Sequence, residues 1–237
     1  MKQVTGSNPF ATPERVSIQQ SLDGHSFSRP VLAEIPEGSE VRVVELILPG
    51  SMLVPERLLS EESARDLLAA NGMPAAPEEQ IVVCRGSVVP PKGDTCGQTS
   101  GRRLPADDAA TRNGQNLQEE EEAVVALVAV EKRILHEIRE RFPEARFTTP
   151  LLDKPLSRRK CVWICRREQL LYIKVYEKGL LRMAEVIPAR TEAETGYFIE
   201  KLGQILPLKE YELRITGEHA KELRKWIGKQ FEKAICE

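Results

Sequence analysis

Short hydrophobic runs separated by turns dominate the second half of the chain. Turns near Arg167-Glu168 and Lys178-Gly179 divide three such runs. Runs of this length, bounded by turn residues, predict a three-strand meander. The predicted strands are residues 161–166, 170–176 and 180–188.

The residues after this meander predict a helix, a strand and a second helix. Thr191 and Glu194 have the spacing of a capping box, and apolar residues at helical spacing continue until Pro207. Residues 211–216 have the pattern of a strand. Apolar residues over 223–231 line one face of a final amphipathic helix.

The first half of the chain repeats this order. Residues 16–22 and 25–32 alternate apolar and polar positions, with Asp23 and Gly24 between them. An Asp-Gly pair is typical of a tight hairpin, because both central positions of the favoured turn need positive φ. Residues 40–48 form a third apolar run that a Pro-Gly pair ends. These runs predict a second three-strand meander.

A helix, a brief strand and a polar segment follow in the first half. Ser60 and the Asn71-Gly72 pair mark the ends of the predicted helix, and residues 80–84 predict a strand. Residues 85–118 are rich in Gly, Pro, Ser, Thr, Asn and Asp and have few bulky apolar side chains. Such a segment cannot offset the entropy of ordering, so we predict a flexible insertion.

Two interpretations exist for the residues after the insertion. Residues 123–130 fit a strand that is buried on both faces, and helical spacing follows as far as Phe142. A single helix over 118–142 is the alternative. We favour strand then helix because the valines cluster before Glu131, and residues 145–151 then predict a further strand.

Together these elements predict two related lobes of the α/β (or α+β) class. Each lobe is a βββαβα unit with a mixed sheet. The expected boundaries are a flexible N-terminus at 1–14, a first lobe at 15–152 that contains the insertion, and a second lobe at 153–237.

Composition and charge limit the function. Hydrophobic residues make up 41% and charged residues 30% of the chain, which is typical of a soluble globular protein. The net charge of -2 provides no overall field for holding nucleic acid. No apolar run resembles a signal peptide or is long enough to span a bilayer. We expect a cytoplasmic protein that binds neither nucleic acid nor membrane.

Cysteines and histidines give no metal or catalytic signature. The five cysteines are odd in number and form no CxxC pair, which favours neither a disulfide framework nor a zinc site. Cys161 and Cys165 fit reduced packing residues on one strand face. The three histidines are scattered and lack ligand spacing. We therefore predict no catalytic residue and no metal site.

The duplicated order of elements resembles the core of the actin and sugar-kinase superfamily. Four segments carry a closer resemblance: SIQQSLDGHSF, LVPERLL, FPEARF and LRITG. They are similar to an uncharacterised bacterial family, domain of unknown function 3822, over nearly the whole chain except the insertion. The resemblance implies an actin-like ATPase fold, in which two ribonuclease-H-like lobes clasp a nucleotide between two early hairpins. It implies no activity, because that family has no assigned substrate.

The resemblance also implies where a nucleotide would bind. In working members each early hairpin carries an Asp-x-Gly turn, whose carboxylate lies near the metal and whose amides receive phosphate oxygens. Here Asp23 and Gly24 are adjacent, and the second hairpin has Arg167 and Glu168 with no glycine. The adenosine site of such folds uses a pair of glycines, whereas Thr216 is followed by Gly217 alone.

Two functions follow from this comparison. The first is a non-catalytic, actin-like protein that binds another protein as a scaffold, needs no cofactor and has a degenerate nucleotide site, a pseudo-ATPase. The alternative is an ATP-binding protein, an ATPase or kinase, that uses ATP and Mg in the cleft between the lobes. In that case Asp23, Gly24 and Ser26 would face phosphate and metal, and Thr216 and Gly217 would lie near the base.

Overall fold

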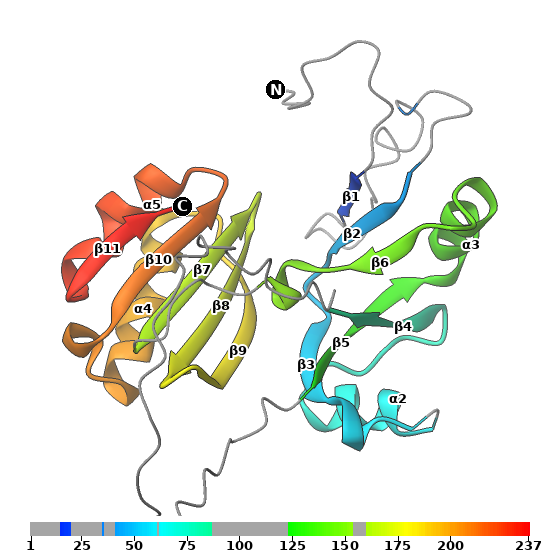
Figure 1. Ribbon diagram of the computed structural model, residues 1–237, viewed down its shortest axis with the longest axis horizontal. Helices are drawn as coiled ribbons and strands as arrows, with labels where there is room; N and C mark the ends of the chain where they lie inside the picture. Colours follow the sequence, from blue (N-terminus) through cyan, green and yellow to red (C-terminus); the bar gives the residue numbers. More distant parts are fainter. Residues whose placement is uncertain (1–14, 20–34, 36–40, 61, 87–122, 154–159) are drawn as a thin grey trace, which may run out of the picture.

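The computed structural model describes residues 15–19, 35, 41–60, 62–86, 123–153 and 160–237. The predicted hairpin at Asp23-Gly24, the run at 25–32 and the insertion from residue 87 onward lie outside the described residues, as do the proposed site residues Asp23, Gly24 and Ser26. The described helices and strands are shown in Figure 1.

The second lobe is a five-stranded mixed sheet with the strand order β11-β10-β7-β8-β9. Within this sheet β8 pairs antiparallel with β7 and β9, and β10 pairs in parallel with β7 on one side and β11 on the other. The strands are β7 (Cys161–Arg167), β8 (Leu170–Glu177), β9 (Leu180–Pro188), β10 (Glu212–Gly217) and β11 (Lys233–Cys236).

Two helices cover one face of this sheet: α4 (Glu192–Ile205) and α5 (Ala220–Ile227). The predicted order of meander, helix, strand and helix is therefore confirmed. The Thr191 capping box is confirmed as well, because the Thr191 side chain accepts from the Glu194 amide and the Glu194 carboxylate accepts from the Thr191 amide. Strand β11 was not predicted.

Alternate residues of β7 explain why its sequence is apolar throughout. Val162 and Ile164 pack into the core beneath the helices. Cys161, Trp163 and Cys165 point to the opposite face and belong to a second core. Because side chains alternate across a strand, a strand covered on both faces loses the polar half of its pattern.

The first lobe contains two three-stranded sheets rather than one. The strands β1 (Arg15–Gln19), β2 (Val43–Ile47) and β6 (Arg146–Thr148) form a parallel sheet in the order β1-β2-β6. The strands β3 (Ser51–Pro55), β5 (Val124–Glu131) and β4 (Glu79–Arg85) form an antiparallel sheet in the order β3-β5-β4.

The predicted meander of the first lobe needs two corrections. Strand β1 pairs directly and in parallel with β2, so these strands are neighbours and not the outer members of a meander. The Pro49-Gly50 pair does follow the end of the third run, as predicted, but it does not close a meander, because the chain bends there and continues as β3 in a second sheet. The Ala129 amide donates to the Gly50 carbonyl and the Ser51 hydroxyl to the Leu48 carbonyl, which fixes the bend.

Helices of the first lobe follow the predictions closely. Helix α2 (Ser63–Ala70) lies within the predicted span, and the Ser60 hydroxyl accepts from the Ser63 amide at its start. Strand β5 followed by α3 (Lys132–Arg141) confirms strand then helix, so the single-helix alternative is wrong. Four 3-10 helices are also described: η1 (Glu56–Leu58), η2 (Pro150–Leu152), η3 (Leu208–Glu210) and η4 (Gly228–Gln230).

The described residues form three hydrophobic cores, and one of them lies between the two lobes. One core lies between the five-stranded sheet and its helices, and another lies between α2 and the antiparallel sheet. The largest core contains residues of both lobes, from β2, β4, β5 and α3 to the helix-free face of the five-stranded sheet. Among the described residues, no helix is both long and apolar enough to cross a membrane.

Candidate functional site

The junction between the lobes is the candidate site, because the resemblance predicts a nucleotide there. Leu46 of β2, Leu48 just after that strand and Leu151 of η2 belong to one core with Trp163 and Tyr172 of the five-stranded sheet. Each of these side chains is at most 2% exposed. The junction is therefore packed with apolar side chains.

A fully buried lysine lies in this core. Lys174 is 0% exposed and occupies the row of β8 that faces the first lobe. Its ammonium donates to the carbonyls of Leu151 at 3.0 Å and Asp153, and it lies 4.0 Å from the centre of the Trp163 ring. A buried ammonium needs such acceptors, so Lys174 fastens η2 of the first lobe to the sheet of the second.

Charged and polar groups line the edge of the junction where β7 ends. The Glu45 carboxylate on β2 is 3% exposed and lies 3.9 Å from the Arg167 guanidinium. Burial raises the pKa of the neighbouring Cys165 thiol, while Arg167 and the Thr216 hydroxyl act in the opposite direction. The two lobes therefore contact each other through opposite charges as well as apolar packing.

Two buried hydroxyls near this edge, those of Thr149 and Thr216, have no nitrogen or oxygen partner among the described residues, and the buried Tyr172 hydroxyl has only the Leu48 backbone beside it. Thr216, Cys165 and Tyr172 are paired across β10, β7 and β8 and so share one sheet face. Burial is also the main cause that raises the pKa of Tyr172. Buried hydroxyls usually have partners, so this row is the part of the junction best suited to hold water or a ligand.

Thr216 and Gly217, predicted for the adenosine site, lie at this edge. Gly217 has a φ of 85°, and a Cβ there would lie 2.2 Å from the Arg166 carbonyl oxygen. The close approach of β10 to the β7–β8 hairpin therefore requires a glycine, whether or not a ligand binds.

The tip of the β7–β8 hairpin is bonded to the residue that follows Gly217. Glu168 has a φ of 45°, a region that glycine adopts most easily. Its amide donates to the Glu218 carboxylate at 2.9 Å, and the Glu218 amide donates to the Arg166 carbonyl at 2.9 Å. The hairpin amide that the resemblance assigns to phosphate is thus bonded to a carboxylate of the same chain.

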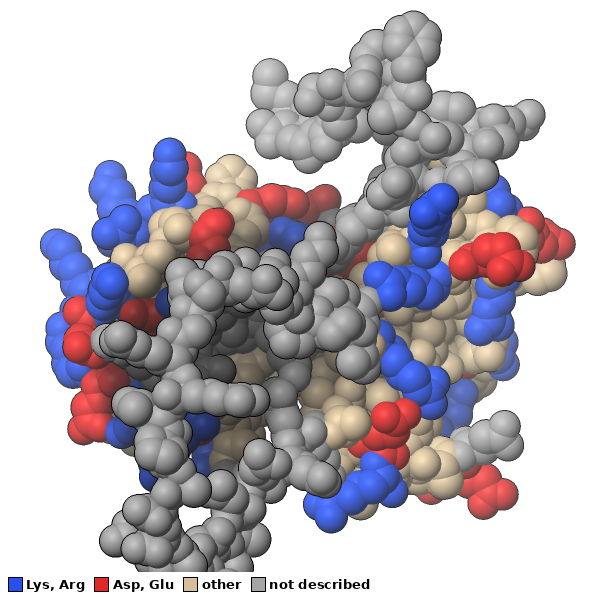
Figure 2. Space-filling model, in the orientation of Figure 1, with Lys and Arg blue, Asp and Glu red and all other residues tan. Residues whose placement is uncertain are grey.

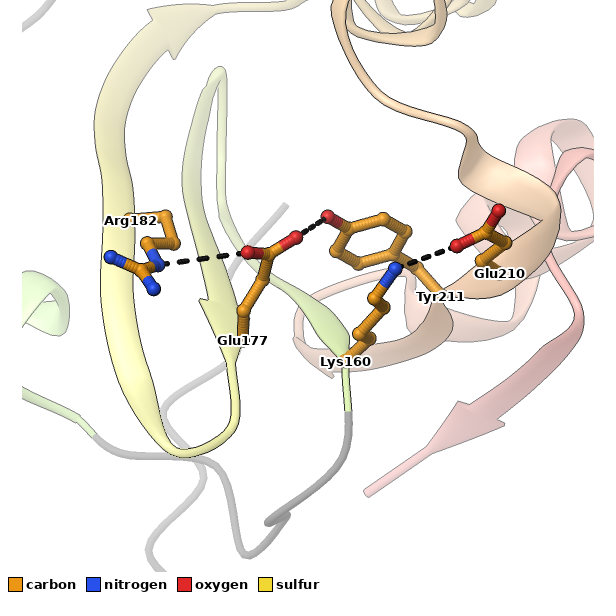
Figure 3. Close-up of polar contacts among 5 residues, drawn as sticks. All are labelled: Lys160, Glu177, Arg182, Glu210 and Tyr211. Carbon is orange, nitrogen blue, oxygen red and sulfur yellow. Dashed lines mark hydrogen bonds and ion pairs between the residues drawn. The ribbon is translucent and has the colours of Figure 1, made fainter.

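A second polar cluster connects the ends of β7, β8 and β10, as Figure 3 shows. The Tyr211 hydroxyl donates to Glu177, which also lies 3.6 Å from Arg182, and Lys160 lies 2.6 Å from Glu210. The hydrogen bond from Tyr211 lowers the pKa of Glu177. The hydrogen bond between Lys160 and Glu210 raises the pKa of Lys160.

The pKa of Tyr211 in this cluster is raised to about 12, first by burial and then by the Glu177 hydrogen bond. All three shifts keep the groups in their ordinary protonation states near neutral pH. None of these three groups has its pKa moved toward neutral pH, where proton transfer is most effective. The cluster instead connects the ends of neighbouring strands.

The described thiols and carboxylates offer no metal site. Within the part of the chain that the structure describes, no three His, Cys, Asp or Glu residues are grouped to hold a metal ion. Cys161 and Cys165 are buried and reduced as predicted. Burial raises the pKa of Cys84 and Cys161 to about 12, so both remain protonated thiols.

Two junction residues, Lys174 and Glu45, were not predicted. Each is a single charged residue inside an apolar strand, in LLYIKVY and VVELI. A charge at a position whose strand neighbours are all apolar is unusual. A lone charged residue in an apolar strand is therefore the sequence signal from which the buried contacts of Lys174 and Glu45 could have been predicted.

Comparisons with known proteins bear on the fold. No family model and no curated protein matches the chain. A crystal structure from Bacteroides thetaiotaomicron VPI-5482, of a protein with an actin-like ATPase fold and unknown function, is similar with a TM-score of 0.61 and 14% identity, covering 95% of this chain and 91% of that one. The cytoplasmic domain of EpsL, an inner membrane component of the type II secretion system of Vibrio cholerae, gives a TM-score of only 0.36 at 9% identity, covering 86% and 82%.

The first of these similarities concerns the fold alone, because the two chains are only 14% identical. Membership of domain of unknown function 3822 stays a prediction, since no family model matches. The chain has an α/β architecture with the actin-like ATPase fold.

Proposed function

We propose that this protein is a non-catalytic member of the actin-like fold that works in the cytoplasm by binding another protein. One observation carries the proposal. Leu151, Trp163 and Lys174 pack the space between the lobes, where a nucleotide would have to enter. Opening that space would expose apolar surface and remove the acceptors of a buried ammonium, which is costly.

The surroundings of the hairpin support the same proposal. The Glu168 amide already donates a hydrogen bond to the Glu218 carboxylate. The close packing of Gly217 against Arg166 is a sufficient reason for a glycine at that position, even with no ligand bound. A phosphate group at the hairpin would have to displace a carboxylate and would meet its negative charge.

The alternative, an ATPase or kinase, is favoured by a different observation. The Thr216 hydroxyl, whose neighbour is the Cys165 thiol and which has no nitrogen or oxygen partner within the described ranges, lies on one sheet face with Tyr172 at the edge of the junction. A nucleotide bound there with Mg would give that hydroxyl a partner, with Asp23, Gly24 and Ser26 as further candidates from the sequence and Gly217 near the base.

Thermal unfolding with and without Mg-ATP separates the two functions. A ligand that binds only the native state must raise the Tm in a saturable way. We expect no Tm change with Mg-ATP or Mg-ADP and no ATP turnover. Thr216→Val is the matched variant, since it keeps the side-chain shape and removes the hydroxyl.

A saturable rise in Tm that Thr216→Val reduces would reject the proposal in favour of the alternative. A protein partner recovered with the wild-type chain should bind equally well in nucleotide-free buffer.

A further inference from the structure

A hollow of about 590 Å³ lies in the first lobe, between α2 and the edge of β4. Helix α2 has only eight residues, and it packs Ala64 and Leu68 over the β3-β5-β4 sheet. Ile81 and Val83 of β4 remain half-buried beside it. Val82 and Cys84, which alternate with them, point into the core shared by the two lobes. The hollow is thus on the far side of this sheet from the lobe junction.

The floor of the hollow is apolar. Leu59, Ala64, Ile81 and Val83 line it, and the last two are the residues of β4 that α2 leaves uncovered. A volume of this size is within the range of about 300 to 1,000 Å³ that is usual for small-molecule sites.

Two cationic side chains at the rim of the hollow, Arg65 and Lys132, are held in place by hydrogen bonds to neutral carbonyl groups. Figure 2 shows that basic side chains are present on this lobe. The Arg65 guanidinium donates to the carbonyls of Ala75 at 2.8 Å and Glu79 at 3.1 Å, and the Lys132 ammonium donates to the Pro77 carbonyl at 2.8 Å. Carbonyl acceptors fix the positions of these side chains without neutralising their charge. Both cations are therefore pre-positioned beside the apolar floor.

The remaining charges do not cancel them. Of the charged residues that line the hollow, Arg65, Arg85 and Lys132 are cationic and Glu79 is anionic, so the lining carries a formal net charge of +2. Arg85 pairs with Glu56 at 2.9 Å, and the Glu79 carboxylate accepts from the Ala76 amide at 2.7 Å. With the Arg85–Glu56 pair set aside, Arg65, Lys132 and the Glu79 carboxylate leave the described lining with a formal net charge of +1.

We propose that this hollow binds a small amphipathic anion. Its apolar body would lie over Ile81 and Val83, and its carboxylate or other acidic head would face Lys132 and Arg65. The pairing follows from the lining itself, because an apolar floor favours a hydrocarbon and a cationic rim favours an acidic group. The site is independent of the function proposed for the lobe junction.

Binding of 8-anilinonaphthalene-1-sulfonate, a fluorescent amphipathic anion, tests the proposal on the full chain. We expect saturable binding at one site, displacement by decanoate, and weaker binding at high salt because the charges are screened. Decanol, which has the same chain without the charge, should displace the probe at least about tenfold less well.

Two variants and one control make the test specific. Ile81→Glu places a negative charge on the floor and should abolish saturable binding. Lys132→Gln should weaken binding about three- to tenfold with the fold intact. Ile205→Glu, at a 75% exposed position on α4 of the other lobe, should change nothing.

Equal probe binding by the wild-type chain and Lys132→Gln, or equal displacement by decanol and decanoate, would overturn the anionic character of the site. Absence of saturable binding by the wild-type chain would overturn the site itself. Because Lys132→Gln alters only the end of an exposed side chain, the test stands even where Ile81→Glu does not fold.

Discussion

Replacing Lys174 with alanine should lower the free energy of unfolding by about 3 to 5 kcal/mol. The substitution removes the ammonium that the Leu151 and Asp153 carbonyls accept from, and it leaves these acceptors without that donor in a buried place. It also removes the contact with the Trp163 ring and leaves a cavity in the core shared by the lobes.

Urea unfolding of the purified variant measures this loss. Lys221→Ala, at an exposed position on α5, is the control and should change stability by less than about 0.5 kcal/mol. Lys174→Met keeps most of the apolar stem, so its loss should be smaller than that of the alanine variant. An unfolding midpoint for Lys174→Ala equal to that of the wild-type chain would show that the lobes are not fastened at this residue.

Gly217→Ala should destabilise the protein by about 2 to 5 kcal/mol, the sum of two costs. A Cβ in the left-handed region costs roughly 1 to 2 kcal/mol, and an overpacked contact costs roughly 1 to 3 kcal/mol. The contact is severe because the new Cβ would lie 2.2 Å from the Arg166 carbonyl oxygen. The hairpin would have to move away from β10, which would also separate Arg167 from Glu45.

Gly179→Ala separates these two costs. Gly179 has a φ of 83°, and a Cβ added there would meet no atom of the described residues within 4 Å, so only the backbone cost of roughly 1 to 2 kcal/mol applies. Comparing the two variants by urea unfolding isolates the contact. Equal losses for Gly179→Ala and Gly217→Ala would contradict the close approach of β10 to the hairpin.

The second lobe was predictable because its elements are set by local patterns. Turn residues such as Lys178-Gly179, with φ values of 52° and 83°, bound strands whose apolar runs have the right length. The Thr191 capping box fixes the start of α4 from sequence alone. Strand β11 was missed because its four residues follow a 3-10 turn and are recognisable only by their pairing with β10.

The first lobe was less predictable because its strand pairing is non-local. Nothing in the sequence of β1 states that it pairs in parallel with β2, which lies more than twenty positions further along the chain. The bend at Gly50 likewise depends on Ala129, which is far away in sequence. Local rules gave the strands and helices here, but not their partners.

The candidate site was likewise predictable from local sequence only in part. Thr216 and Gly217 do lie at the lobe junction, but the role of Gly217 depends on the Arg166 carbonyl, which only the tertiary structure brings near. Lys174 acquires its acceptors from η2, a segment more than twenty positions away. Predictions for Asp23, Gly24 and Ser26 stay predictions, since these residues lie outside the described part of the chain.

The most direct test of the packed lobe junction uses the fluorescence of Trp163. The chain has two tryptophans, so Trp226→Phe leaves Trp163, which is 2% exposed in the core between the lobes, as the sole reporter. The account predicts blue-shifted emission that acrylamide does not quench, with or without Mg-ATP. Red-shifted emission that acrylamide quenches freely would contradict it, because the lobes would then be separated by solvent.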